Sequence, residues 1–166
     1  MPFRSKESYA HYYAKETFKE WLHRTWDFNR AHGYKNVLSI FDWEIDCSDP
    51  QKGVRLEYPI YSKTLSDGRK DILGLRSLWK ELPTEEQVQR GNLLLEATID
   101  LVICEKGRAK YGIEIVHKHI CGQKKRDFLS SLKSLGIDFP VYEVSASWIL
   151  DQLHGFVPKQ LDMVRV

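Results

Sequence analysis

A long segment near the N-terminus repeats apolar residues at helical spacing. Neither Pro nor Gly occurs between Ser5 and Asn29, and Gly33 follows soon after. Apolar residues at this spacing are typical of an amphipathic helix, and a glycine commonly follows the last helical turn. We therefore expect a long helix from Ser5 to about Asn29.

The next apolar segments have the composition of β-strands. Residues 36–45 and 54–61 are rich in β-branched and aromatic residues and are separated by the turn-forming residues 47–53. Residues 93–104 and 110–119 flank the polar, glycine-containing reversal 105–109. These patterns predict two strands followed by a β-hairpin.

The segment 62–92 is more polar, and we expect it to be a helical insertion. A short helix is expected from about Gly74 to Lys80. A second is expected to start at residues 83–86, where a proline and early acidic residues suit a helix N-terminus.

After the hairpin, the pattern predicts a helix, a strand and a helix. The first helix covers residues 123–135, with Phe128, Leu132 and Leu135 on one face and Gly136 after it. The strand covers 140–144, and the last helix covers 147–153, with Ser145 or Ser147 as its cap. The expected fold is α/β (α+β mixed): one domain over residues 1–166, with a mixed central sheet flanked by helices.

Composition supports a single domain and limits its partners. The chain has 166 residues, 42% of them hydrophobic, which suffices for one core. The net charge is only +2, so any contact with nucleic acid must come from local basic clusters. The three cysteines form no CxxC pair, and no apolar run resembles a signal peptide or membrane span. We expect an intracellular protein, in cytoplasm or nucleus, that is not secreted and contacts no membrane.

The hairpin carries the first candidate chemistry. If it is symmetric about Gly107, paired residue numbers sum to about 214, and Asp100 faces Glu114. Two facing carboxylates in apolar strands require a compensating cation, and Mg²⁺ or Mn²⁺ suits such oxygen ligands. Lys118 shares the face of Glu114 and could neutralise a phosphate. Alternatively, the carboxylates face solvent and Lys118 is only their salt-bridge partner.

Glu7, His11 and Lys15 form a polar stripe along the first helix. Their i, i+4, i+8 spacing continues into the apolar residues Ala14, Phe18 and Leu22. Because the apolar half must pack on the sheet, the polar half is expected to point at the sheet's edge or a cleft. The alternative is a solvated first turn with i, i+4 pairs.

The chain resembles the nuclease-like domain related to the competence protein CoiA. The similarity lies in Glu7-Ser8-x-x-His11-x-x-x-Lys15, in Thr98-Ile99-Asp100-Leu101-Val102-Ile103 and in Gly112-Ile113-Glu114-Ile115-Val116. Residues 114–119 and 82–84 also look like a branch of that family found in large DNA viruses.

This resemblance, which covers about residues 5–153, implies a PD-(D/E)XK, restriction-endonuclease-like core and Mg²⁺-dependent hydrolysis of DNA phosphodiesters. It implies Asp100 and Glu114 as metal ligands, with Glu7, His11 and Lys15 lining the site. Val116 departs from the family, which has lysine or glutamine there. Three alternatives follow: Lys118 takes the role of the family's lysine, Lys15 takes that role, or the site no longer cuts DNA.

A basic run and one further acid are also candidate site residues. Lys124, Lys125 and Arg126 open the helix beside the proposed site and could hold a DNA backbone, although such a run is usually a solvated face. Glu57 could add a third carboxylate or simply face solvent. By analogy with two-strand cutters, a homodimer is possible. The competing hypothesis is a catalytically inactive nuclease scaffold that binds nucleic acid or acts as a structural or interaction module.

Overall fold

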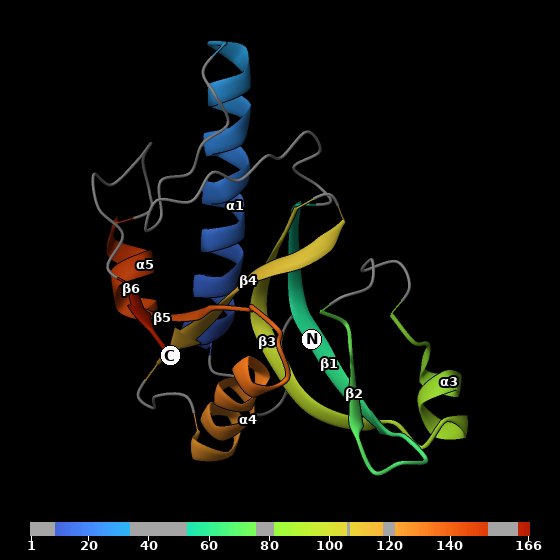
Figure 1. Ribbon diagram of the computed structural model, residues 1–166. Helices are drawn as coiled ribbons and strands as arrows, with labels where there is room; N and C mark the ends of the chain where they lie inside the picture. Colours follow the sequence, from blue (N-terminus) through green and yellow to red (C-terminus); the bar gives the residue numbers. More distant parts are fainter. Residues whose placement is uncertain (1–8, 34–52, 76–81, 106, 118–121, 153–162) are drawn as a thin grey trace.

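The computed structural model describes residues 9–33, 53–75, 82–105, 107–117, 122–152 and 163–166 (Figure 1). Its elements, in chain order, are α1 Tyr9–Ala31, β1 Val54–Thr64, β2 Lys70–Leu73, α3 Glu85–Arg90, β3 Leu94–Glu105, β4 Arg108–Val116, α4 Gln123–Ser134, β5 Val141–Ser145, α5 Ala146–Gln152 and β6 Met163–Arg165. The strands form one sheet in the order β2-β1-β3-β4-β5-β6. β4 and β5 are parallel and the other neighbours are antiparallel. The expected mixed sheet flanked by helices is confirmed.

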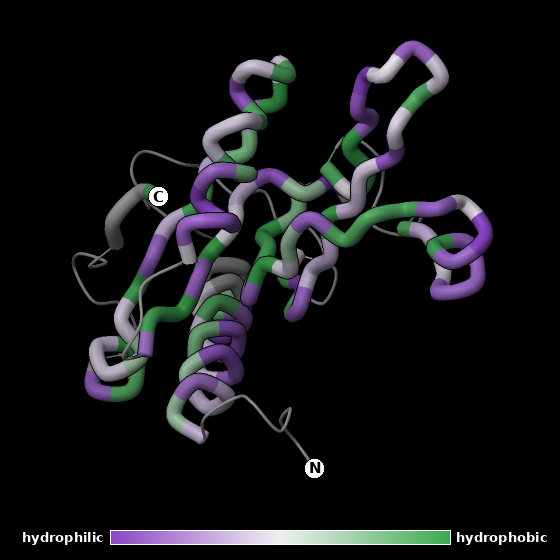
Figure 2. Tube along the Cα trace, turned by 90° about the horizontal axis from the view of Figure 1, so that it is seen from below, coloured by the Kyte–Doolittle hydropathy of each residue, from purple (hydrophilic) through white to green (hydrophobic). Residues whose placement is uncertain are grey.

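Two hydrophobic cores lie against the sheet. The first, here called the α1 core, joins Phe18 and Leu22 of α1 and Ile149 of α5 to strand residues such as Ile113 and Ile115. The second, the α4 core, joins Leu129 and Leu132 of α4 to strand residues that include Tyr58, Ile99 and Val141. In Figure 2, hydrophobic and hydrophilic residues follow different sides of α1. The helix therefore buries one side against the sheet, as its sequence pattern predicts.

Two neighbouring strands change face at the same level of the sheet. In β1, Leu56 packs on the α1 core but Tyr58 belongs to the α4 core, although residues two apart normally share a face. In β3, Leu101 and Ile99 differ in the same way. Glu57 stands between the β1 residues with a left-handed backbone (φ 52°), and Asp100 stands between those of β3. The strands therefore rotate at the level where the two acidic residues occur.

Most predicted elements are present. Helix α1, strand β1, the hairpin of β3 and β4, helix α4, strand β5 and helix α5 lie where the sequence patterns predict them. The hairpin register is also confirmed, because Leu101 pairs with Ile113 and Val102 with Gly112, and both sums are 214. Ser145 is the residue that caps α5: its hydroxyl accepts a hydrogen bond from the backbone amide of Trp148 at 3.4 Å.

The segment 62–92 differs from the expected helical insertion. β1 continues to Thr64 and the chain returns as β2, which pairs with β1 as an edge strand. The backbone hydrogen bonds between β1 and β2 stabilise a strand here, although the segment is polar. Gly74 is not helical, and residues 76–80 of the expected helix lie outside the described residues, as do residues 36–45. The helix after Thr84 is present as α3, and Thr84 and Gln87 form a capping box.

One detail predicted for α4 is wrong, namely the position of Leu135 on its apolar face. Leu135 is 41% exposed, whereas Leu129 and Leu132 are buried. The helix ends at Ser134, so Leu135 no longer follows the apolar face. None of the described helices combines the length and the apolar content that a membrane crossing requires.

Candidate functional site

Asp100 and Glu114 lie together in the interior of the sheet. The register that pairs Leu101 with Ile113 places them at facing positions one residue further along. The two carboxyl groups are close enough for each to perturb the pKa of the other, and both residues are less than 10% exposed. The predicted carboxylate pair is therefore present, and it is buried.

Asp100 is held by helix α1 and by the next strand. One of its oxygens, Oδ2, accepts hydrogen bonds from the backbone amide of Ile115 at 2.8 Å and from Nε2 of His11 at 3.2 Å. The same Nε2 lies 3.1 Å from the carbonyl oxygen of Ile115. A carbonyl can only accept, so Nε2 of His11 carries a proton. Burial raises the pKa of Asp100, but the hydrogen bonds from His11 and Ile115 outweigh it, so the net pKa is lowered.

Glu114 faces α4. Its Oε1 accepts a hydrogen bond from Nζ of Lys125 at 2.9 Å, and the same Nζ donates to the carbonyl oxygen of Thr98 at 2.8 Å. Burial, together with the neighbouring charge of Asp100, raises the pKa of Glu114 to about 8 despite the ion pair with Lys125. The pair Asp100–Glu114 therefore shares one negative charge and one proton near neutral pH.

Further acids extend this pair into a row across the sheet. Glu114 pairs in parallel register with Glu143 of β5. On the other side, the pairs Leu56–Leu101 and Tyr58–Ile99 leave Glu57 at the position facing Asp100. We call Glu57, Asp100, Glu114 and Glu143 the acid row. Each member has a basic partner: Lys15 for Glu57, His11 for Asp100, Lys125 for Glu114 and Arg126 for Glu143.

Several predicted site residues meet in this row. His11 and Lys15 do point from α1 into the sheet rather than into solvent, and Lys15 is only 4% exposed. Lys125 and Arg126 lie at the site as expected, but their contacts are carboxylates. Lys124 is exposed and Val116 is half-buried. Glu7 and Lys118 lie outside the described residues.

The sequence patterns did not indicate Glu143 or the carbonyl of Thr98. Glu143 was an acidic residue in a short buried strand, and that conflict between charge and burial was the available signal. The role of Thr98 is a backbone contact, which side-chain patterns cannot reveal. Glu57 is the candidate third carboxylate of the sequence, and its left-handed backbone is visible only in the fold.

The carboxylate pair fits a divalent cation in one specific respect. Two oxygen ligands stand side by side, and burial together with the charge of Asp100 favours a proton on Glu114. A cation bound there would replace that proton. In the described part of the chain, no cluster of three or more His, Cys, Asp or Glu side chains has a metal-holding arrangement. Mg²⁺ commonly uses only one or two protein carboxylates and takes its other ligands from water and phosphate.

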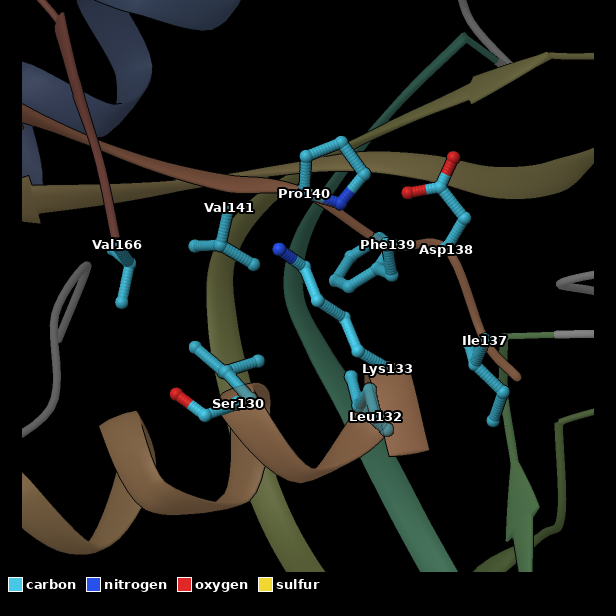
Figure 3. A pocket seen from close by; sticks show the side chains of 10 residues that line it. Ser130, Leu132, Lys133, Ile137, Asp138, Phe139, Pro140, Val141 and Val166 are labelled. Atoms are coloured by element: carbon cyan, nitrogen blue, oxygen red, sulfur yellow. The ribbon is translucent and has the colours of Figure 1, made fainter. Parts of the chain in front are cut away.

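A pocket of about 180 Å³ lies elsewhere, between α4 and the segment that leads into β5. Figure 3 shows Ser130 and Lys133 of α4 on one side and Phe139, Pro140 and Val166 around the other. No member of the acid row lines it. The pocket is therefore separate from the candidate site.

Comparison with known proteins adds no assignment, because no family model, no curated protein and no solved structure matches the chain.

Proposed function

We propose that the protein is a metal-dependent nuclease that hydrolyses phosphodiester bonds of DNA at the acid row. The observation that supports this most directly is the buried pair of Asp100 and Glu114, whose facing carboxylates offer adjacent oxygen ligands to a divalent cation. The resemblance to CoiA-like nucleases, with a restriction-endonuclease-like core, supports the same function.

In this proposal Asp100 and Glu114 would hold Mg²⁺ or Mn²⁺. The cation would supply Lewis-acid activation of the phosphate and lower the pKa of an attacking water. Hydrolysis forms one bond from the water oxygen to phosphorus and breaks one bond from phosphorus to a sugar oxygen. One water proton passes to solvent or to a nearby base, and the leaving sugar oxygen takes up a proton.

Residues around the pair would position these groups. His11 and the amide of Ile115 fix the orientation of Asp100 through Oδ2. Lys15 is buried against Glu57 and would hold the neighbouring strand in place. Lys124 is exposed beside the site and would attract the DNA backbone without reading its sequence.

The test is cleavage of plasmid, linear duplex, single-stranded and branched DNA with Mg²⁺, Mn²⁺ or EDTA. Asp100→Asn keeps an oxygen acceptor for the amide of Ile115 but removes the charge. We expect metal-dependent cleavage by the wild type and a loss of about 10²–10³-fold or more in the variant. Asp71→Asn, at an exposed position of β2, is the matched control and should cut normally. Equal cleavage by Asp100→Asn and wild type would contradict the assignment.

A catalytically inactive scaffold is the second candidate, and it could bind nucleic acid or another protein. Two observations favour it: Val116 occupies the position of the usual lysine or glutamine, and every acid of the row already has a basic partner. Thermal unfolding with increasing Mn²⁺ separates the two candidates. A ligand that binds the native state raises its stability, so a nuclease site gives a shift that Asp100→Asn lacks, whereas the inactive scaffold gives none.

A further inference from the structure

Lys125 of helix α4 lies at the carboxylate pair of Asp100 and Glu114. Lys125 bridges the two strands of the hairpin, because its Nζ contacts the carbonyl of Thr98 in β3 and the carboxylate of Glu114 in β4. The ammonium group is therefore positioned at the carboxylate pair by two bonds to different strands. The side chain remains 28% exposed, so a phosphate can approach it from solvent.

Lys15 is positioned differently. It is bound to Glu57, and its side chain is 4% exposed. A buried lysine that already neutralises a carboxylate can reach an incoming phosphate only if α1 moves away from the sheet. Lys15 is therefore suited to holding the strand, whereas Lys125 is suited to contact with substrate.

The start of α4 adds to the positive potential at this place. Lys125 is the third residue of the helix, and the N-cap residue Gly122 has no side chain with which to cap the first amides. The N-terminus of a helix carries a partial positive charge that favours phosphate. Lys124 and Arg126 add two further positive charges in the same turn.

We infer that Lys125 is a catalytic residue of this site and contacts the phosphate that is cut. The inference rests on the proposed nuclease function. With a cation held by Glu114, the attraction of Glu114 for Lys125 would fall, and the bond to the carbonyl of Thr98 would keep Nζ in place. The ammonium group would then donate to a non-bridging phosphate oxygen, whose negative charge grows during hydrolysis. Lys125 thus supplies the positive charge that Val116 does not.

The experiment compares Lys125→Met with Lys133→Met, which removes the same charge from an exposed position in the last turn of the same helix. Single-turnover cleavage is measured with saturating Mn²⁺, and Mn²⁺ binding is measured separately by thermal shift. We expect Lys125→Met to retain the Mn²⁺-dependent shift and to cut about 10²-fold more slowly at saturating DNA. Lys133→Met should cut at the wild-type rate, because Lys133 lies at the other end of α4 and contacts no member of the acid row.

A second variant covers the possibility that Lys125→Met does not fold. Lys125→Arg keeps the charge and the ion pair with Glu114 but changes the geometry of the donor, so we expect about a tenfold loss of rate. If Lys125→Met cuts within about threefold of Lys133→Met, or Lys125→Arg matches wild type while Lys125→Met is unfolded, the assignment of Lys125 is wrong. Absence of cleavage by the wild type, in contrast, contradicts the proposed function itself.

Discussion

Lys15, at one end of the acid row, is far more buried than the basic partners that α4 supplies at the other end. Glu57 and Asp100 are paired with Lys15 and His11 from α1, and Lys15 is almost completely buried. Glu114 and Glu143 are paired with Lys125 and Arg126 from α4, whose side chains are each 28% exposed. A buried cation cannot exchange its partner for water, whereas a half-exposed one can. We expect the α1 half to contribute mainly to stability and the α4 half to be available for ligand.

The largest effect on stability should come from the proton on Glu114. Its pKa is raised from 4.5 to about 8 in the folded protein, so the folded state binds more protons than the unfolded state between these values. The free energy of unfolding should therefore fall as pH rises from about 4.5 to about 8, by on the order of 4–5 kcal/mol. Glu114→Gln should remove this slope. Urea unfolding measured across that pH range tests the prediction.

Asp100 acts in the opposite direction at lower pH. Its folded pKa is below its ordinary value of 3.8, so its contribution to stability is present above that value and is lost as pH falls through the folded pKa. If the stability of the wild type falls as the pH is lowered from 8 to 5, that result contradicts the raised pKa of Glu114. Asp71→Asn serves as the control for general effects of removing an acid, since Asp71 is exposed.

The next largest effect on the free energy of unfolding is expected at the two outer acids of the row. Glu57→Ala leaves a buried Lys15 without this carboxylate, and we expect a loss of about 2 kcal/mol in the free energy of unfolding. Glu143→Ala leaves a half-exposed Arg126 that can turn to water, so its loss should be below about 1 kcal/mol. Chemical denaturation of both variants provides the measurement.

A double variant shows whether burial of Lys15 is the cause. Lys15→Met removes the charge but keeps an apolar stem, so Lys15→Met/Glu57→Ala should recover part of the stability that Glu57→Ala loses. Equal losses for Glu57→Ala and Glu143→Ala would remove the proposed difference between the two halves.

The smallest effect concerns the backbone of Glu57. Its φ of 52° is unfavourable for any residue with a Cβ atom. In the Lys15→Met background, Glu57→Gly should therefore be about 0.5–1 kcal/mol more stable than Glu57→Ala. Arg55, in the same strand, has no left-handed backbone, and there the glycine variant should be the less stable of the two. The same order at both positions would show that Glu57 is not strained.

Such strain at an acidic residue in mid-strand is common where function requires a particular side-chain direction. The left-handed residue occurs where β1 and β3 both change the core on which they pack. An unfavourable backbone conformation is therefore present at the acid row. The contacts of Lys15 and His11 with Glu57 and Asp100 stabilise the strands at this point.

The sequence by itself determined the local elements and the central pair. The helical spacing of residues 9–31, the alternating strands around Gly107 and the symmetric hairpin register depend on near neighbours in the chain, so their patterns are visible without a fold. The same register predicted Asp100 beside Glu114, and the stripe on α1 predicted that His11 and Lys15 point at the sheet.

Only the tertiary structure decided which basic residue meets which acid. Lys125 is 11 residues from Glu114, and Lys15 is 42 residues from Glu57. These pairings depend on how two helices dock on opposite faces of the sheet. The extension of β1, the edge strand β2 and the parallel pairing of Glu114 with Glu143 also arise from contacts between distant segments. Because a single-strand pattern carries no information about the neighbouring strand or the covering helix, the acid row became visible only once the sheet was assembled.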